Sequence, residues 1–169
     1  MTIYFGDGTS VSTAPTGGAF SSYAILWEKQ NAGTHAGSSH TSWYKRNLNH
    51  EHYDPDGIVS LSSAQFTLQT GSYLFRFGGG GFDLNFDLQL RVRNVTDSSN
   101  ACFSGPGTGP GYSDGNGWGY GVGQTTISGQ KVFELQQRAD NDRGSHGWGR
   151  AMNLGDYEIW ATMEIFKES

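Results

Sequence analysis

Two histidines separated by one residue are the most suggestive chemical group in this chain of 169 residues. They occur in the segment His50-Glu51-His52, and Asp56 follows four positions after the second histidine. In a β-strand, residues i and i+2 point to the same face, so the two imidazoles would lie side by side. Imidazole nitrogens are ligands for zinc, copper, iron and nickel. His50, His52 and Asp56 are therefore candidate metal ligands, although we expect surface or interface histidines without a metal.

Two acidic clusters contain oxygens that suit calcium. They are Asp54-Pro55-Asp56-Gly57 and Asp140-Asn141-Asp142-Arg143-Gly144. Neither continues into the Asp-x-Asp-x-Asp-Gly loop with a terminal Glu that calcium loops use. Asp and Asn also stabilise tight turns through bonds to their own backbone. We therefore predict two turns and no cofactor, with calcium as the alternative.

Groups for other catalysis are sparse. Cys102 stands between Ala101 and Phe103, which suggests a small buried thiol, and no serine lies in a Gly-x-Ser-x-Gly segment. A nucleophile needs a neighbouring base, and the sequence offers no such pairing by spacing. Paired carboxylates of a glycosidase meet only in space, so the sequence leaves them open. We expect a protein that is not an enzyme.

Aromatic residues within polar, glycine-rich segments are more informative about binding. Tyr112, Trp118, Tyr120 and Trp148 lie among Gly, Ser, Asp and Asn. Binding loops of other β-sandwiches have this composition. The alternative is that the rings pack beneath their own loops. We predict that at least one of them contacts a partner, either a glycan or a protein.

The elements that position these residues are β-strands. The chain has 26 glycines, and each glycine costs about 1 kcal/mol relative to alanine inside a helix. Residues 82–93 alternate apolar and polar side chains with a strict period of two, which indicates a strand. Similar shorter patterns recur along the chain. They predict an all-β, antiparallel, two-sheet sandwich of about eight to ten strands.

Composition excludes several functions and divides the chain in two. A net charge of −5 argues against nucleic-acid binding, and no apolar run is long enough for membrane insertion. Residues 1–7 lack the basic and apolar regions of a signal peptide. Ile3-Tyr4-Phe5 is a short strand candidate, followed by Ser, Thr, Ala, Gly and Pro up to residue 22. We predict an N-terminal segment and linker over 1–22 and a head domain over 23–169.

Two segments carry a resemblance to a known fold family. Residues 57–61 and 66–77, in which Phe66, Gly71 and Tyr73 open an alternating strand, resemble the central strands of tumour-necrosis-factor-like and complement globular-head jelly rolls. Residues 155–161 resemble the last strand of that family. The resemblance implies a jelly roll over residues 23–167, usually a homotrimer. Trp160 and Phe166 fall on the outward face of the predicted last strand, so we expect them at the trimer interface.

The first residues carry a second resemblance. Residues 1–9 resemble the opening of short structural proteins of tailed bacteriophages, particularly those of cyanobacteria and marine bacteria. This implies a virion protein assembled in the host cytoplasm: a trimeric tail fibre or knob for host attachment, or alternatively a capsid decoration or head-fibre protein. Ile3, Tyr4 and Phe5 would anchor it to other phage structural proteins, as an added edge strand. The alternative is that this segment lies on its own domain.

A small metal enzyme of the cupin type is the more remote alternative. The segment His50-Glu51-His52 is similar to the first cupin motif, but Asp56 stands where that motif continues to a Glu. The second motif, Pro-x-Gly-x-x-His, does not occur, and His146 is the only distant candidate ligand.

Overall fold

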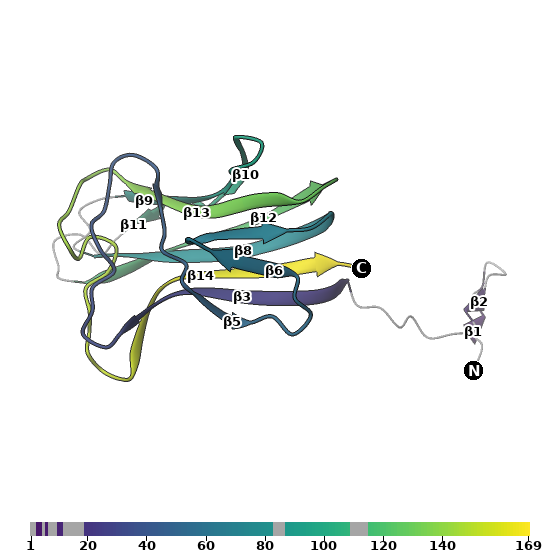
Figure 1. Cartoon of the computed structure of the whole chain (residues 1–169), viewed down its shortest axis with the longest axis horizontal. Coiled ribbons are helices and arrows are strands. Elements are labelled where there is room, and N and C mark those ends of the chain that lie inside the picture. Colours follow the sequence, from purple (N-terminus) through teal and green to yellow (C-terminus); the bar gives the residue numbers. More distant parts are fainter. Residues whose placement is uncertain (1–2, 5, 7–9, 12–18, 83–86, 109–114) are drawn as a thin grey trace.

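The computed structural model describes residues 3–4, 6, 10–11, 19–82, 87–108 and 115–169. These residues form two antiparallel sheets that pack face to face (Figure 1). The predicted all-β jelly-roll sandwich is thereby confirmed. Within the described residues, no helix is long and apolar enough to cross a membrane.

One sheet has five strands and contains the long strands of the fold. Its order is β12-β8-β14-β3-β5. The bounds are β12 Asn116–Ile127, β8 Gly71–Phe82, β14 Tyr157–Glu168, β3 Phe20–Asn31 and β5 His50–Tyr53.

The other sheet has seven strands. Its main path is β10-β9-β13-β7-β6, with β11 paired to β9 and β4 paired to β13. The bounds are β10 Ser99–Phe103, β9 Asp87–Asn94, β13 Lys131–Ala139, β7 Gln65–Leu68, β6 Val59–Ser62, β11 Gly107–Thr108 and β4 Tyr44–Lys45. The strand count exceeds the predicted eight to ten partly because β4 and β11 have two residues each, too short to show a period in sequence.

The N-terminal segment forms its own small hairpin. Strand β1, Ile3–Tyr4, pairs antiparallel with β2, Ser10–Val11. Phe5, the third predicted anchor residue, lies outside the described residues. The sandwich begins with β3 at Phe20, slightly before the predicted domain boundary, and the boundary itself stays a prediction.

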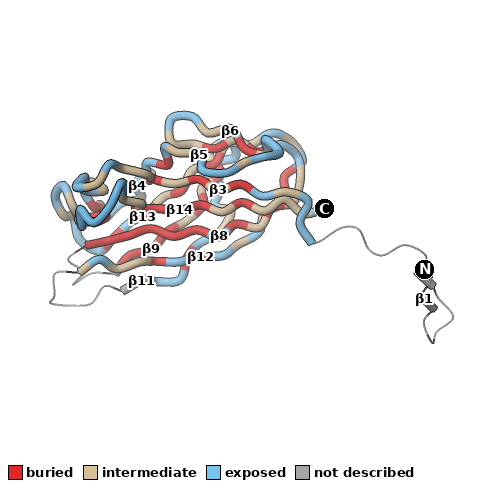
Figure 2. The backbone as a smooth tube through the Cα atoms, turned by 90° about the horizontal axis from the view of Figure 1, so that it is seen from below, coloured by how far each residue is buried: buried red, intermediate tan, exposed pale blue. Residues whose placement is uncertain are grey.

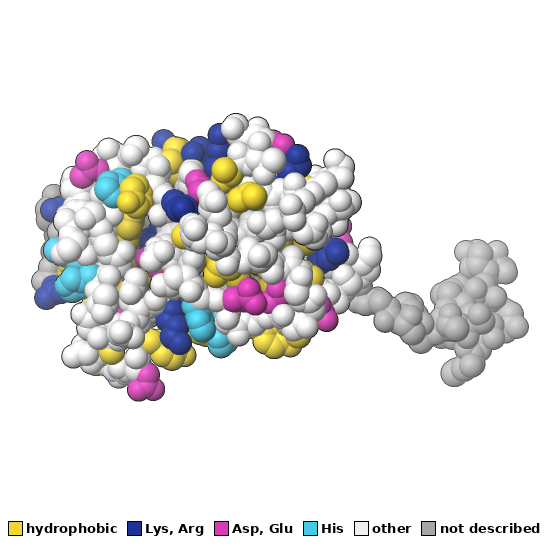
Figure 3. Space-filling view, viewed as in Figure 1, with side chains coloured by type: hydrophobic (Ala, Val, Ile, Leu, Met, Phe, Trp, Pro, Cys, Tyr) yellow, Lys and Arg dark blue, Asp and Glu magenta, His cyan; other side chains and the backbone are white. Residues whose placement is uncertain are grey.

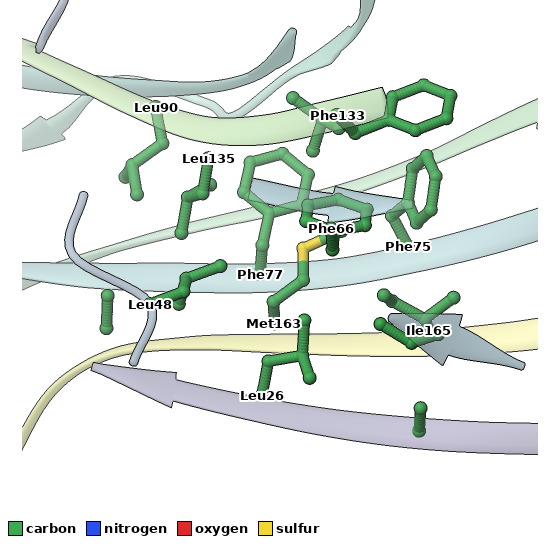
Figure 4. Packing of buried hydrophobic residues seen from close by; sticks show 14 of the residues in the cluster. Leu26, Leu48, Phe66, Phe75, Phe77, Leu90, Phe133, Leu135, Met163 and Ile165 are labelled. Atoms are coloured by element: carbon green, nitrogen blue, oxygen red, sulfur yellow. The ribbon is translucent and has the colours of Figure 1, made fainter. Parts of the chain in front are cut away.

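The core lies between the two sheets and follows the two-residue period. Figure 2 shows buried and less buried residues alternating along the long strands. Phe66 of β7, Phe75 of β8 and Phe133 of β13 are buried, with ring centroids 5.6 to 6.2 Å apart. Leu26 and Met163, which lie in the same sheet as Phe75, belong to the same core (Figure 4). Burial of these large side chains compensates for the low aliphatic content.

Two sequence expectations about strand ends are wrong. The alternation over 82–93 is not one strand: Phe82 ends β8, and β9 begins at Asp87. The sequence suggests glycine-rich loops at 78–81 and 105–123, with a strand beginning near Trp118 as the alternative, but the glycines at 78–81 and 117–123 lie within β8 and β12. The reason is steric, because a Cβ at Gly79 would collide with Gln137 and Leu90 of the opposite sheet.

Gly121→Ala is expected to destabilise the fold. Its Cβ would meet the Phe77 ring and lie 2.9 Å from the backbone Cα of Ser104, neither of which can move freely. Overpacking of this kind costs about 1–3 kcal/mol. The matched control is Gly129→Ala, where a Cβ meets no atom within 4 Å. Chemical denaturation measures both, and equal midpoints for the two variants would contradict the packing argument.

Candidate functional site

Strand β12 places its large side chains on the outer face of the sheet and its glycines on the core side, the reverse of what a solvent-exposed strand usually shows. Gly119, Gly121 and Gly123 face the core, where a Cβ on each would collide with Leu88, Phe77 and Cys102 respectively. Tyr120 and Val122 alternate with them on the outer face and are 71 % and 63 % exposed. A half-buried strand normally places its apolar residues inward. The outer face of the five-stranded sheet therefore presents apolar side chains to the surroundings.

The apolar character continues across the sheet to β14, β3 and β5. The Phe166 ring lies 5.3 Å from that of Phe20 and 6.0 Å from that of Tyr23. The Tyr23 ring in turn stacks on Tyr53 at 4.8 Å. Because these rings come from three neighbouring strands, they form a continuous layer. Phe166 thus lies on the outward face, as its strand position predicts.

A second group of rings surrounds Trp27 in the middle of β3. His52 stacks on the Trp27 ring with centroids 3.5 Å apart, and His50 lies 5.8 Å away. Tyr157 lies on another side at 6.2 Å, with the Lys29 ammonium 4.3 Å from its ring. Figure 3 shows hydrophobic and histidine side chains along the lower edge of the molecule, where Figure 1 places β3 and β5.

We call this surface the aromatic face. It comprises Phe20, Tyr23, Trp27, His50, His52, Tyr53, Tyr120, Val122 and Phe166. In its midst, Arg76 and Glu164 form an ion pair with N···O 3.2 Å, so their charges offset each other. A contiguous apolar surface with little net charge is typical of a protein–protein interface.

The candidate metal ligands lie at the margin of the aromatic face. His50 and His52 are on one strand face, as predicted, with ring centroids 6.1 Å apart. Asp56 is exposed in the turn beyond β5. Among the described residues, no three His, Cys, Asp or Glu side chains gather as a metal site would require. The two histidines are instead positioned by the Trp27 ring.

Both acidic clusters accept hydrogen bonds from backbone N–H groups. The two carboxylate oxygens of Asp54 accept them from Ile58 and Val59, both at 2.9 Å, which is the local turn chemistry that Asp supplies. Asp142 Oδ1 instead accepts one from the backbone of Thr41, a residue distant in sequence, at 2.6 Å.

The expected exposure of Trp160 is wrong. Trp160 is only 5 % exposed, and its indole N–H donates a hydrogen bond to the Thr34 carbonyl at 3.1 Å. The register of β14 against β3 shifts between Ile159 and Ala161. A β-bulge inserts an extra residue, so the side chains beyond it change face relative to a strict alternation. Trp160 therefore needs no partner to cover it.

The four aromatic residues predicted to face a partner separate into different environments. Trp148 is 3 % exposed and lies under the Arg46 guanidinium, which corrects its expected exposure. Trp118 is half-buried, with its ring 6.2 Å from Tyr120. Tyr120 is exposed, but on a strand rather than in a loop. Tyr112 lies outside the described residues.

Cys102 is unsuited to nucleophilic chemistry. Burial raises the pKa of its thiol to about 12, against a smaller opposing effect of a hydrogen bond with the Val92 backbone. The thiolate is the reactive form of cysteine, so this group stays unreactive near neutral pH.

Sequence reasoning missed Tyr23 and Trp27 as surface residues. The run from Tyr23 to Trp27 is apolar at every position, and the structure buries Ala24 and Leu26 while Tyr23 and Trp27 point outward. A strand that is apolar on both faces is one whose two faces are both covered. That uninterrupted run was the available signal for an interface.

No protein-family model matches the chain. No curated protein sequence matches it either. Several solved structures share its fold. Murine APRIL at pH 5.0 aligns with a TM-score of 0.52 and 7% identity over 86% of this chain and 98% of that chain.

Two further structures extend the comparison. Eiger TNF from S. frugiperda aligns with a TM-score of 0.50 and 11% identity, over 87% of this chain and 92% of that chain. The vertex protein P5 of phage PRD1 aligns with a TM-score of 0.52 and 15% identity, over 90% of this chain and 100% of that chain. At such identities the likeness shows a shared tumour-necrosis-factor-like jelly roll.

The environment of His50 predicts a measurable pKa change. Burial lowers the pKa of His50 below 6.5, and Lys29 and His52 lower it further. Because the folded state favours neutral His50, its contribution to stability is complete above pH 6.5 and declines as the pH falls through that value. Lys29→Gln removes one of the causes and should raise the pKa of His50 in an NMR titration. Lys131→Gln, on the other sheet, is the control, and an unchanged His50 pKa in Lys29→Gln would contradict this electrostatic account.

Proposed function

We propose that this chain is a structural protein of a tailed-bacteriophage particle and is not an enzyme. Its jelly-roll head assembles as a homotrimer through the aromatic face, and its N-terminal segment binds other particle proteins. The observation that carries the proposal is the inverted pattern of β12, where glycines face the core and Tyr120 and Val122 face outward. Such a pattern costs solubility unless a partner covers the outer face.

A second copy of this chain is the occupant that best suits the aromatic face. The residues of the face come from four strands of one sheet, and rings outnumber charged side chains on it, which is the composition of interfaces between identical subunits. Its one central ion pair, Arg76–Glu164, is already satisfied within the chain. The resemblance to tumour-necrosis-factor-like and complement globular-head jelly rolls implies three copies.

The N-terminal segment supports attachment to a larger particle. Ile3 and Tyr4 form a short strand, and residues 12–19 are only Ser, Thr, Ala, Pro and Gly, a linker composition. A short strand on a linker can pair with an open sheet edge of another protein. Ile3, Tyr4 and Phe5 are the residues proposed to make this attachment.

Two positions in the particle suit such a head. The first is a tail fibre or knob, which displays the head for attachment to the host surface. The second is a capsid decoration or head-fibre protein, and one observation favours it: the shared fold with a phage vertex protein. Both positions use the same trimeric head and N-terminal attachment.

Self-association is tested by the mass in solution. Light scattering should give about three times the 18.4 kDa chain mass for the wild type, and Val122→Asp should shift it toward one chain, because the buried carboxylate would lack a partner. Phe103→Asp, an exposed apolar strand residue on the other sheet, is the matched control and should leave the trimer intact. A wild-type mass of 18.4 kDa at micromolar concentration would contradict the homotrimer.

The position in the particle is tested by labelling. Antibodies against residues 20–169 should decorate purified particles from cells that produce this protein, and electron microscopy would show tail or capsid. A chain lacking residues 1–19, which keeps all of β3 and Phe20, should still form the trimer yet be absent from the particles. Incorporation of that truncated chain at the wild-type level would contradict the proposed anchor.

A further inference from the structure

A compact group of cationic side chains lies on the outer face of the seven-stranded sheet. In register across four strands stand Phe103 of β10, Arg91 of β9, Gln136 of β13 and Lys45 of β4. Arg93 lies two residues after Arg91 on β9, opposite Glu134, and Arg138 lies opposite Gln89. We call Lys45, Arg91, Arg93 and Arg138 the cationic patch. Figure 3 shows several Lys and Arg side chains along the top of the molecule, over β9, β10 and β13 of Figure 1.

The four charges of the patch bind neutral oxygens. Arg91 Nε donates to Gln136 Oε1 at 2.6 Å, and Arg93 Nη1 donates to Asn100 Oδ1 at 3.2 Å. Arg138 Nη2 donates to Gln89 Oε1 at 3.1 Å, and Lys45 Nζ donates to the Ser63 carbonyl at 2.7 Å. In the part of the chain that the structure describes, none of the four lies within ion-pair distance of a carboxylate. The positive charge is therefore oriented by amides and carbonyls but not neutralised.

The carboxylate of Glu134, which stands opposite Arg93, is hydrogen-bonded to side-chain amides and, within the described residues, not to an arginine. Glu134 accepts hydrogen bonds from the side-chain amides of Gln65 and Gln136. Burial lowers the pKa of Arg91, and Arg93 and Arg138 lower it further, while Glu134 opposes them. At Arg91, the repulsion from the two neighbouring arginines thus exceeds the attraction of Glu134. An anion placed among them would relieve this repulsion.

Aromatic rings hold the guanidinium groups in place. The Trp43 ring lies 4.2 Å from the Arg91 guanidinium carbon and 4.7 Å from that of Arg138. Phe103, 47 % exposed, lies beside Trp43 with ring centroids 6.0 Å apart. Cation–π contacts fix the planes of the two arginines, so less side-chain entropy is lost when an anion binds.

A cleft with a mixed polar and apolar lining adjoins the patch at Arg138. It has a volume of about 460 Å³, and its lining includes Thr41, Arg138, Asp87 and Asp140 together with the apolar Leu88 and Pro106. This volume lies within the range of small-ligand sites. Carboxylates beside an arginine accept hydrogen bonds from hydroxyl groups but repel further anions. The site therefore suits a ligand that carries both hydroxyls and a few separated anionic groups.

We propose that the cationic patch and this cleft bind an acidic oligosaccharide, with its carboxylate or sulfate groups on the arginines and its hydroxyls in the cleft. The exposed Phe103 ring offers an apolar surface for the face of a sugar ring. A nucleic acid or anionic membrane fits less well, because Asp87 and Asp140 would meet its closely spaced phosphates. The inference rests on the proposed function only for its biological role, which would be recognition of the host surface.

The patch is compatible with the proposed trimer. It lies on the seven-stranded sheet, whereas the aromatic face lies on the five-stranded sheet, and the hydrophobic core separates the two outer surfaces. Self-association through the aromatic face would leave the cationic patch open on every copy. Three patches on one particle head would increase avidity for a repeated glycan.

Calorimetry on the full chain tests the site with three hexasaccharides: a sulfated galactan, an oligogalacturonate and a neutral galactan. At least one acidic probe should bind, at least tenfold more tightly than the neutral galactan, and added salt should weaken the binding. The two acidic probes distinguish sulfate from carboxylate. Arg91→Gln/Arg138→Gln should reduce the affinity about tenfold or more. The control, Lys131→Gln on the same sheet, removes a charge already paired with Asp97 and should leave it unchanged.

Several results would overturn the site. These are no binding of either acidic probe, unchanged affinity in the double variant, or tighter binding of single-stranded DNA or of anionic phospholipid vesicles. If circular dichroism shows that the double variant is unfolded, Arg93→Gln replaces it, because the Arg93 guanidinium bonds to Asn100 and its loss removes no contact with Trp43. Unchanged affinity in Arg93→Gln would then overturn the site. Light scattering on the same samples reports the oligomeric state separately, so failure of the trimer and failure of glycan binding are distinguishable.

Discussion

The buried guanidinium of Arg46 joins the two sheets. It donates to Glu28 Oε2 of β3 at 2.7 Å, to the Gly80 carbonyl of β8 at 3.2 Å and to the Trp160 carbonyl of β14 at 2.9 Å. From the opposite sheet, Gln137 Oε1 accepts a further bond at 2.8 Å. Removing one partner of such a pair costs about 3–5 kcal/mol, because a buried charge is left without compensation. The arrangement fixes which parts of four strands meet at this end of the sandwich.

The close approach at Arg46 has consequences for the strands beside it. Gln137 and Leu90 reach so near to β8 that only glycine fits at position 79, and the same crowding extends to Gly119 and Gly121 of β12. Leu88, Leu90 and Cys102 of the seven-stranded sheet and the Phe77 ring of the neighbouring β8 therefore fill the space on the core side of β12. The large residues of β12 are left on the outside. The same steric crowding thus explains both why β12 places glycines toward the core and why its large apolar residues lie on the outer face.

The two outer surfaces of the sandwich have opposite chemistry. The five-stranded sheet presents stacked rings with one internal ion pair, which favours a second copy of the chain. The seven-stranded sheet presents arginines oriented by amides and by Trp43, which favours an anionic ligand. The proposed self-association and the proposed ligand binding would therefore use separate surfaces of one domain.

The sequence by itself determined the all-β sandwich, the paired orientation of His50 and His52 and the outward position of Phe166. These depend on the two-residue period of a strand, which is a local property of the backbone. Tertiary structure alone decided the burial of Trp160 and Trp148 and the strand positions of the glycine runs. A bulge interrupts the period at Trp160, and the glycines of β8 and β12 are crowded by residues distant in sequence, both in the opposite sheet and in the neighbouring strand. The arginines of the cationic patch meet only through strand register, because β9 and β13 are neighbours in the sheet but far apart in the chain.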